Sequence, residues 1–208
     1  IEQANKPWLA AIHGSALGGG LEIAMACRFR VAVQSAQMGM PEVKLGLIPG
    51  AGGCVRLPRL VGAQKATEMI VKGNPIKAPQ ALELGLVDAI FEDDLATQSL
   101  AWFEQALEQP LPLPVLERPA PSVSAEEWEQ FAKAYLPRDK REQAPGMALE
   151  CVKKACGDDV PAAQAFERAT FLELRGSAQA RALRHVFFAE RAAVRPPELK
   201  GVEAKDIT

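Results

Sequence analysis

Proline is concentrated in one short stretch of this 208-residue chain, and no other feature constrains the fold more. Five of the twelve residues from 110 to 121 are prolines. Because proline has no amide hydrogen and clashes with the preceding helical turn, this stretch cannot form a regular helix or a central strand. We therefore expect a proline-rich extended connector over residues 110–124, which separates residues 1–109 from residues 125–208.

The part before the connector has the pattern of a mixed α/β structure. Short apolar runs of the buried-strand type alternate with helical segments that are bounded by glycines. Gly14 and Ser15 are expected to form a turn, and the alternating polarity of residues 29–33 indicates a strand. The expected strands are residues 7–12, 29–33, 37–40 and 87–90, and the expected helices are residues 21–27, 54–60, 63–71, 79–84 and 95–107.

The part after the connector is poor in glycine, and its apolar residues recur at helical spacing. Ser124 followed by Glu127 fits a capping box at the start of the first helix. We expect these helices to be packing elements. They are predicted at residues 125–135, 146–155, 161–174 and 178–193.

Composition excludes several classes of function. The chain has 24 Lys and Arg against 26 Asp and Glu, a net charge of −2, so we expect no nucleic-acid partner. No apolar run approaches the roughly 18 residues of a membrane span, so we expect no membrane insertion. The four cysteines lie too far apart for a secreted disulfide framework, and neither histidine has metal-ligand spacing to a cysteine. We therefore expect a reducing compartment and no metal site.

The first candidate site is the glycine cluster Gly18–Gly20, which leads into a helix that carries Glu22. Amide N–H groups at a helix start carry partial positive charge, and glycine lets a ligand approach them closely. Such an amide can stabilise an oxyanion as charge develops on a carbonyl oxygen. The alternative is a plain glycine-rich turn in which Glu22 interacts with the helix dipole.

The second candidate is Glu42, which lies among Met40, Val43 and Leu45. If it is buried among these apolar side chains, its pKa is raised and it can donate a proton near neutral pH. The alternative is a solvent-facing loop residue. The nearby glycines of residues 50–53 fit neither a phosphate-binding loop nor a dinucleotide fingerprint. The residues alone therefore indicate acid–base chemistry beside a polarised carbonyl.

Several long motifs in residues 6–91 follow one another in the order known from one family. They are residues 6–14, 16–24, 41–53, 56–59 and 73–88. On these motifs the chain resembles the crotonase, or enoyl-CoA hydratase/isomerase, superfamily. The resemblance implies an α/β fold, a spiral of ββα repeats that is followed here by a helical C-terminal region. It also implies an acyl-CoA substrate and no separate cofactor, since the substrate itself carries the coenzyme A.

The resemblance also implies a role for each glutamate. Glu22 and Glu42 match the pair with which hydratases add water across the C2–C3 double bond of a 2-enoyl-CoA in fatty-acid β-oxidation. Glu42 would give a proton to C2, and Glu22 would orient and deprotonate the water. Having both favours a hydratase over an enoyl-CoA isomerase, which remains an alternative because Glu42 alone could shuttle a proton. A truncated, non-catalytic scaffold is the second alternative.

The remaining site residues follow from the same motifs. Gly19 would supply one oxyanion-hole amide, Gly50 would hold the water through its amide, and Leu17 and Gly18 would contact the substrate. The family's second oxyanion-hole amide and its loop for the CoA nucleotide precede the segment that starts at Ile1. We therefore expect that an N-terminal part of the hydratase core is missing from residues 1–109.

Residues 171–191 resemble the linker helix of bifunctional enoyl-CoA hydratase/3-hydroxyacyl-CoA dehydrogenases, including the peroxisomal type. In those enzymes a dehydrogenase domain follows this helix. We therefore expect the hydratase part of a larger protein, with that domain or further copies of the chain as partner. No NAD site is expected within the chain, which lacks a dinucleotide fingerprint. No targeting signal is visible, and the resemblance leaves two compartments open, the bacterial cytoplasm and the peroxisome. The acyl-chain length also stays open.

Overall fold

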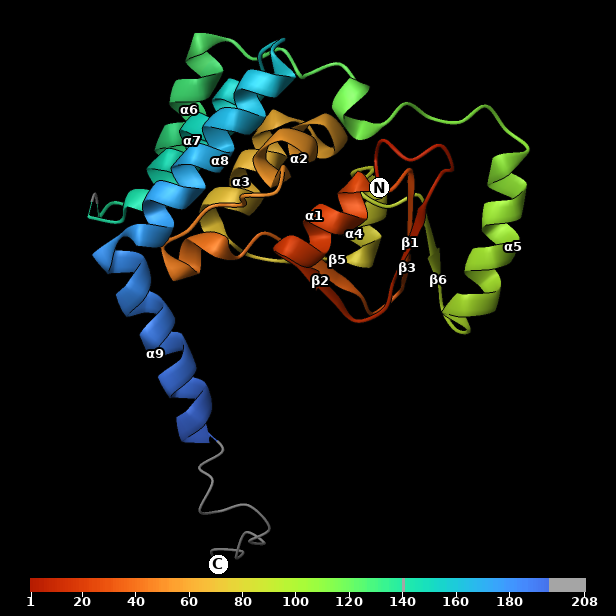
Figure 1. The fold of residues 1–208 in the computed structure, drawn as a ribbon, viewed down its shortest axis with the longest axis horizontal. Helices are drawn as coiled ribbons and strands as arrows, with labels where there is room; N and C mark the ends of the chain where they lie inside the picture. The colour runs from red at the N-terminus through yellow and green to blue at the C-terminus, as the bar shows by residue number, and fades with distance from the viewer. Residues whose placement is uncertain (140, 195–208) are drawn as a thin grey trace, which may run out of the picture.

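The computed structural model describes residues 1–139 and 141–194, and within them two small sheets are followed by a helical region (Figure 1). The first sheet is parallel, in the order β1 (Leu9–Ile12), β3 (Phe29–Val33) and β6 (Ala89–Phe91). The second has the order β2 (Ser15–Leu17), β4 (Gln37–Gly39) and β5 (Ile76–Lys77), with β4 parallel to β2 and antiparallel to β5.

The first repeat begins with β1 and β2 and the second with β3 and β4, and each repeat places one strand in each sheet. Strand β1 passes to β2 through His13 and Gly14, where Gly14 has a φ of +80°, and β3 passes to β4 through residues 34–36. Ala11 lies opposite Val31 in the first sheet, and Ala16 lies opposite Met38 in the second. The expected turn at Ser15 was wrong, because the parallel pairing with β4 already begins at that residue.

Strand β3 lies where we expected a strand, but its alternating polarity was misleading. All five residues are buried, and Arg30 is fully buried among them. The Arg30 guanidinium donates to the carbonyl oxygens of Leu86, at 2.9 Å, and Cys27, at 2.7 Å. It also lies 3.7 Å from a carboxylate oxygen of Asp88. These partners allow a charged residue to occupy the middle strand of the sheet.

The α-helices agree closely with the expected ones, whereas the two short 3₁₀ helices were not expected. The helices are α1 (Gly19–Ala26), η1 (Glu42–Leu45), α2 (Gly53–Val61), α3 (Ala63–Lys72), α4 (Ala78–Glu83), α5 (Leu95–Leu107), η2 (Val115–Glu117), α6 (Ala125–Tyr135), α7 (Gln143–Ala155), α8 (Val160–Gly176) and α9 (Ala178–Val194), of which η1 and η2 are 3₁₀ helices. Helix α7 begins three residues earlier than expected because Pro145 is tolerated in the first turn. The capping box at Ser124 is confirmed.

The proline-rich stretch is not wholly extended, which corrects the expectation for it. Its middle forms the short helix η2, in which Val115 is almost completely buried. The amide of Leu116 donates to Glu2 Oε1 at 3.0 Å, so this turn is tied to the start of the chain. A three-residue turn fits between Pro114 and Pro119 because no proline interrupts it.

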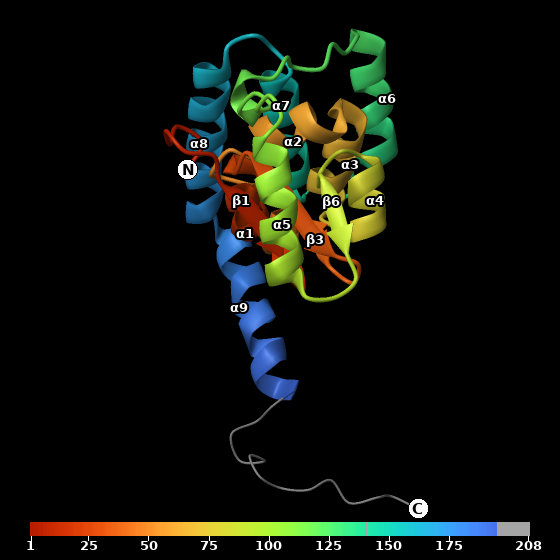
Figure 2. The ribbon, with the colours of Figure 1, turned by 90° about the vertical axis from the view of Figure 1, so that its right-hand side faces the viewer.

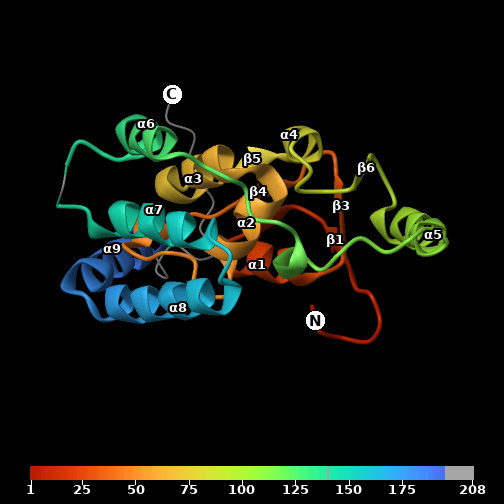
Figure 3. The ribbon, with the colours of Figure 1, turned by 90° about the horizontal axis from the view of Figure 1, so that it is seen from above.

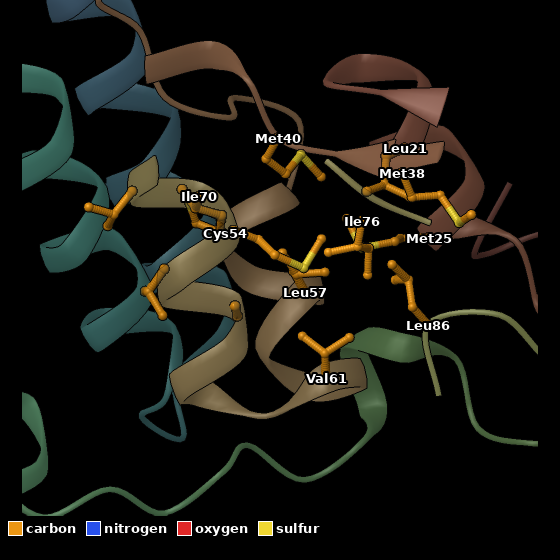
Figure 4. Close-up of a cluster of buried hydrophobic side chains, with 14 of the residues drawn as sticks. Leu21, Met25, Met38, Met40, Cys54, Leu57, Val61, Ile70, Ile76 and Leu86 are labelled. Carbon is orange, nitrogen blue, oxygen red and sulfur yellow. The ribbon is translucent and has the colours of Figure 1, made fainter. Parts of the chain in front are cut away.

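One hydrophobic core joins the sheets to the C-terminal helices. Figure 4 shows its centre, to which Leu21, Met38, Leu57 and Ile70 contribute from four different elements. Trp128 of α6 and further side chains of α7 and α8 belong to the same cluster. The helices after residue 124 therefore complete the core that the first part begins.

The remaining helices are placed around this core. Helix α5 packs against β1 and β3 (Figure 2), and α7 and α8 lie side by side next to α2 (Figure 3). Helix α9 contacts η1 near its start and then extends away from the body of the molecule (Figure 1). In residues 1–139 and 141–194, no helix combines the length and apolar character that crossing a membrane requires.

Candidate active site

The start of α1 exposes backbone where the sequence predicts an oxyanion-binding amide. Gly19 is the first helical residue, so its N–H has no acceptor within the helix. It is exposed, and a Cβ atom placed on it would meet nothing within 4 Å. The preceding Gly18 is buried, and its amide donates to the Gly39 carbonyl oxygen at 2.9 Å. Leu17, at the end of β2, is 40% exposed.

Glu22 is buried in the first turn of α1, with 6% of its surface exposed. Its Oε1 accepts hydrogen bonds from the amides of Ala51, at 2.7 Å, and Gly53, at 2.9 Å. These amides belong to the start of α2, so Glu22 is directed to the N-terminus of a neighbouring helix. This contact holds Oε1 in place and joins the two glycine clusters of the sequence into one site.

Glu42 is half-buried at the start of η1 rather than solvent-facing. Its Oε2 is buried and has no hydrogen-bond partner within the described residues. Burial raises the pKa of Glu42 to about 7; a hydrogen bond to its own backbone opposes this increase, and the charge of Glu22 adds to it. Glu42 therefore combines the two properties of a proton donor near neutral pH, a raised pKa and a free oxygen.

Gly18 lies between the two glutamates. A Cβ atom on Gly18 would lie 2.7 Å from Glu42 Oε1, and the Gly18 carbonyl oxygen accepts the Glu22 amide at 3.0 Å. The structure thus brings together the start of α1, Glu22 and Glu42, as the motifs predict. The water-binding role predicted for Gly50 stays a prediction. Its backbone is covered by helix α8, because a Cβ atom there would lie 2.5 Å from Phe171 Cγ.

A cavity of about 600 Å³ borders one side of this arrangement. Glu22, Ala51 and Arg56 line it together with Ile23 of α1 and Gln164 of α8. Glu42 and residues 17–19 are not among the residues that line this cavity. In the part of the chain that the structure describes, no three His, Cys, Asp or Glu side chains gather as a metal site requires.

Glu167 of α8 is a buried carboxylate that sequence reasoning missed. It is 1% exposed, and its Oε1 and Oε2 accept the amides of Gly52, at 2.5 Å, and Cys54, at 2.7 Å. Burial raises the pKa of Glu167 to about 7, although both amide hydrogen bonds oppose the increase. A signal was present: Glu167 shares the helical stripe of Ala163, Thr170 and Leu174, which is the buried face of α8.

Comparisons with known proteins identify the family of this chain. Residues 1–118, more than half of the chain, match the family described as enoyl-CoA hydratase/isomerase. The human "Peroxisomal bifunctional enzyme" is 40% identical over 202 residues, which cover 93% of this chain and 27% of that protein. The cucumber "Glyoxysomal fatty acid beta-oxidation multifunctional protein MFP-a" is 40% identical over 212 residues, covering 95% of this chain and 28% of that protein. The chain thus spans little more than a quarter of these relatives.

Two solved structures share the fold. An enoyl-CoA hydratase/isomerase from Pseudoalteromonas atlantica T6c has a TM-score of 0.62 at 26% identity, over 91% of this chain and 64% of that one. A carnitinyl-CoA hydratase from Mycobacterium avium has a TM-score of 0.60 at 32% identity, over 89% of this chain and 60% of that one. With its ββα repeats, its paired glutamates and the match over residues 1–118, the chain belongs to the enoyl-CoA hydratase/isomerase family and has the crotonase fold.

Proposed function

We propose that the chain is the hydratase part of a bifunctional β-oxidation enzyme and adds water to the C2–C3 double bond of a trans-2-enoyl-CoA. The observation that carries this proposal is the pair of carboxylates on either side of Gly18. Glu22 is fixed by two backbone amides, whereas Glu42 is half-buried with a pKa of about 7 and a free oxygen. One side chain is thus suited to orient and deprotonate water and the other to donate a proton.

The proposed reaction begins with polarisation of the thioester. The Gly19 amide at the positive end of α1 binds the thioester oxygen and withdraws electrons from C3. A water molecule then forms its O–C3 bond and gives one proton to Glu22, for which we assign the Oε2 atom. The electron pair of the double bond takes the Glu42 proton at C2. The reaction leaves Glu22 protonated and Glu42 ionised, and proton exchange with solvent restores both.

Double-bond isomerisation is the second candidate activity. It needs one group that removes a proton from a carbon and returns it two carbons away. Glu42 supports it, because a carboxyl with a pKa of about 7 is populated in both forms near neutral pH. The oxyanion-binding amide of Gly19 would serve both reactions, so we propose isomerisation as a side activity.

The names of the relatives support the wider context of this proposal. They are called bifunctional or multifunctional, and several are called peroxisomal or glyoxysomal. We propose that a dehydrogenase domain of the same protein takes up the 3-hydroxyacyl product, and that the chain acts in a peroxisomal type of β-oxidation. Hydration transfers no electrons, so we propose that this step uses no cofactor beyond the CoA of the substrate.

The test is hydration of a short trans-2-enoyl-CoA by the full chain, measured as loss of the ultraviolet absorbance of the conjugated thioester. Glu42→Gln removes the proton donor with little change of shape, and Glu83→Gln on exposed α4 is the matched control. We expect turnover in the wild type and the control and its loss in Glu42→Gln. Equal turnover in Glu42→Gln would contradict the role assigned to Glu42.

The scaffold alternative is tested by ligand binding. Enoyl-CoA or acyl-CoA should raise the melting temperature of the chain, because a ligand that binds only the native state stabilises it. If the chain neither hydrates enoyl-CoA nor gains thermal stability from CoA thioesters of any length, the hydratase proposal is wrong and the scaffold is favoured.

A further inference from the structure

Four consecutive amides at the start of α2 alternate between two buried carboxylates. The amides of Ala51 and Gly53 donate to Glu22 Oε1. The amides of Gly52 and Cys54 donate to Glu167, one to each oxygen. Glu22 belongs to α1 and Glu167 to α8, so this short segment is held by two helices, one from each side of the proline-rich stretch.

The alternation depends on the backbone conformation of Gly52. Its φ is +97°, in the left-handed region, which directs neighbouring amides to different sides of the segment. A Cβ atom on Gly52 would collide with the Arg56 guanidinium, which donates to the Ala51 carbonyl oxygen at 2.8 Å. In this arrangement all four amides have acceptors.

Helix α8 also contacts the residue just before these amides. Phe171, one turn after Glu167, covers Gly50, and Arg168 donates to the Gly50 carbonyl oxygen at 3.4 Å. The same face of α8 thus touches both ends of the segment that holds Glu22. A change at Glu167 would reach Glu22 through the backbone of residues 51–54.

We propose that Glu167 is a positioning residue for Glu22. This inference rests on the proposed function only because that function makes Glu22 the general base. By accepting the Gly52 and Cys54 amides, Glu167 holds the segment so that the Ala51 and Gly53 amides face Glu22. Without it, two buried donors lose their acceptor, and the segment must turn to satisfy them. Glu22 would then lose the two bonds that fix its carboxylate.

A purely structural role predicts something different. A carboxylate at a helix N-terminus can stabilise the helix without affecting any neighbouring residue. Its loss would then lower the melting temperature, leave kcat unchanged and disturb only the Gly52 and Cys54 amides. A positioning role requires a fall in kcat and a disturbance of the Ala51 and Gly53 amides as well.

The first measurement is steady-state hydration by the full chain carrying Glu167→Gln. Glutamine keeps the shape, but its NH2 group cannot accept an amide hydrogen, so one of the two bonds is lost. We expect kcat to fall roughly 100-fold with little change in KM, because a base displaced by about 1 Å loses this much. Glu173→Gln, on the exposed face of the same helix, is the control and should leave kcat unchanged. If Glu167→Gln does not fold, Glu167→Asp replaces it, since it keeps the charge but shortens the reach.

The second measurement needs no turnover. Amide hydrogen exchange, followed by NMR, compares the wild type with the folded variant. We expect faster exchange at Ala51 and Gly53 as well as at Gly52 and Cys54. Wild-type kcat in the folded variant, or a change confined to Gly52 and Cys54, would overturn the proposal. If the wild type shows no hydratase activity, the proposed function fails, and the exchange at Ala51 and Gly53 alone decides whether Glu167 positions Glu22.

Discussion

Gly18 and Glu42 approach so closely that a Cβ atom on Gly18 would lie 2.7 Å from Glu42 Oε1. Gly18 also has φ +55° and ψ −125°, a conformation that L side chains rarely adopt. Two independent constraints therefore require glycine at the residue that precedes α1. Because the neighbouring Gly19 carries the predicted oxyanion-binding amide, the same contact sets the distance between that amide and the proposed proton donor.

Gly18→Ala is expected to lower both activity and stability. The methyl group must displace the Glu42 carboxyl, and the backbone is strained whatever the space, at a cost of about 1–3 kcal/mol. The free energy of unfolding from urea denaturation and kcat for hydration measure the two effects. Gly20→Ala is the control for stability, because a Cβ atom there meets nothing within 4 Å and alanine favours helix. Wild-type stability and kcat in Gly18→Ala would contradict this account.

The hydration rate should fall as the pH rises through about 7. The proposed donor is the protonated form of Glu42, and its pKa is raised to about 7 by burial, with the Glu22 charge adding to the increase. Above this pH the active fraction decreases about tenfold for each unit. The measurement is kcat/KM for hydration against pH. A rate that keeps increasing up to about pH 9 would show that Glu42 does not act as the acid.

The free energy of unfolding should also decrease as the pH rises and Glu42 ionises. Its folded-state pKa lies above the ordinary value of 4.5, so its burial is favourable when it is neutral. This contribution is complete below about pH 4.5 and is lost as the pH rises through about 7, by about 3 kcal/mol in total. The glutamine of Glu42→Gln stays neutral. As the pH rises over that range, the free energy of unfolding of the variant should therefore increase by this amount relative to that of the wild type. Parallel curves for the two proteins would contradict the raised pKa.

Glu22→Gln is expected to separate hydration from isomerisation. The glutamine oxygen can still accept the Ala51 and Gly53 amides, so the local structure should persist. Loss of the general base should lower hydration by roughly 10²- to 10⁴-fold. Isomerisation of a 3-enoyl-CoA should be less affected, because we assign that proton transfer to Glu42. Retention of hydration would count against the role assigned to Glu22.

The elements that the sequence predicted well are those whose signals are local. The bounds of α5 and α6 are as expected, since α6 begins at its own capping box, Ser124 and Glu127. Strands β2 and β5 were not predicted, because they have only three and two residues, respectively, and depend on pairing with β4. The pattern at Arg30 misled because its carboxylate partner, Asp88, lies 58 residues further along the chain.

The same distinction applies to the candidate site. Glu22 and Glu42 were identified because each is next to a glycine cluster within a long motif of the family. Glu167 was missed because the amides that it binds, Gly52 and Cys54, are 115 and 113 residues away in the sequence. The helical stripe that Glu167 shares with Ala163, Thr170 and Leu174 indicates that this residue is buried, but no local pattern identifies the distant amides that it binds.

Helix α9 offers a last test, because it packs against η1, the short helix that carries the proposed proton donor Glu42. Gly46 ends η1 with a φ of +68°, and a Cβ atom there would lie 3.1 Å from the Cα of Ala180 in α9. Ala180 is fully buried, so Ala180→Leu must push α9 and η1 apart at a cost of about 1–3 kcal/mol. Because Glu42 is the first residue of η1, kcat for hydration should fall as well.

The exposed Ala189 of the same helix provides the matched control, since Ala189→Leu adds the same side chain without burying it. Both variants are compared by urea denaturation and by hydration kinetics. A loss of stability in Ala180→Leu with unchanged kcat would mean that η1 keeps its position without α9. A loss of both, absent from Ala189→Leu, would make α9 part of the support for Glu42, as α8 is for Glu22.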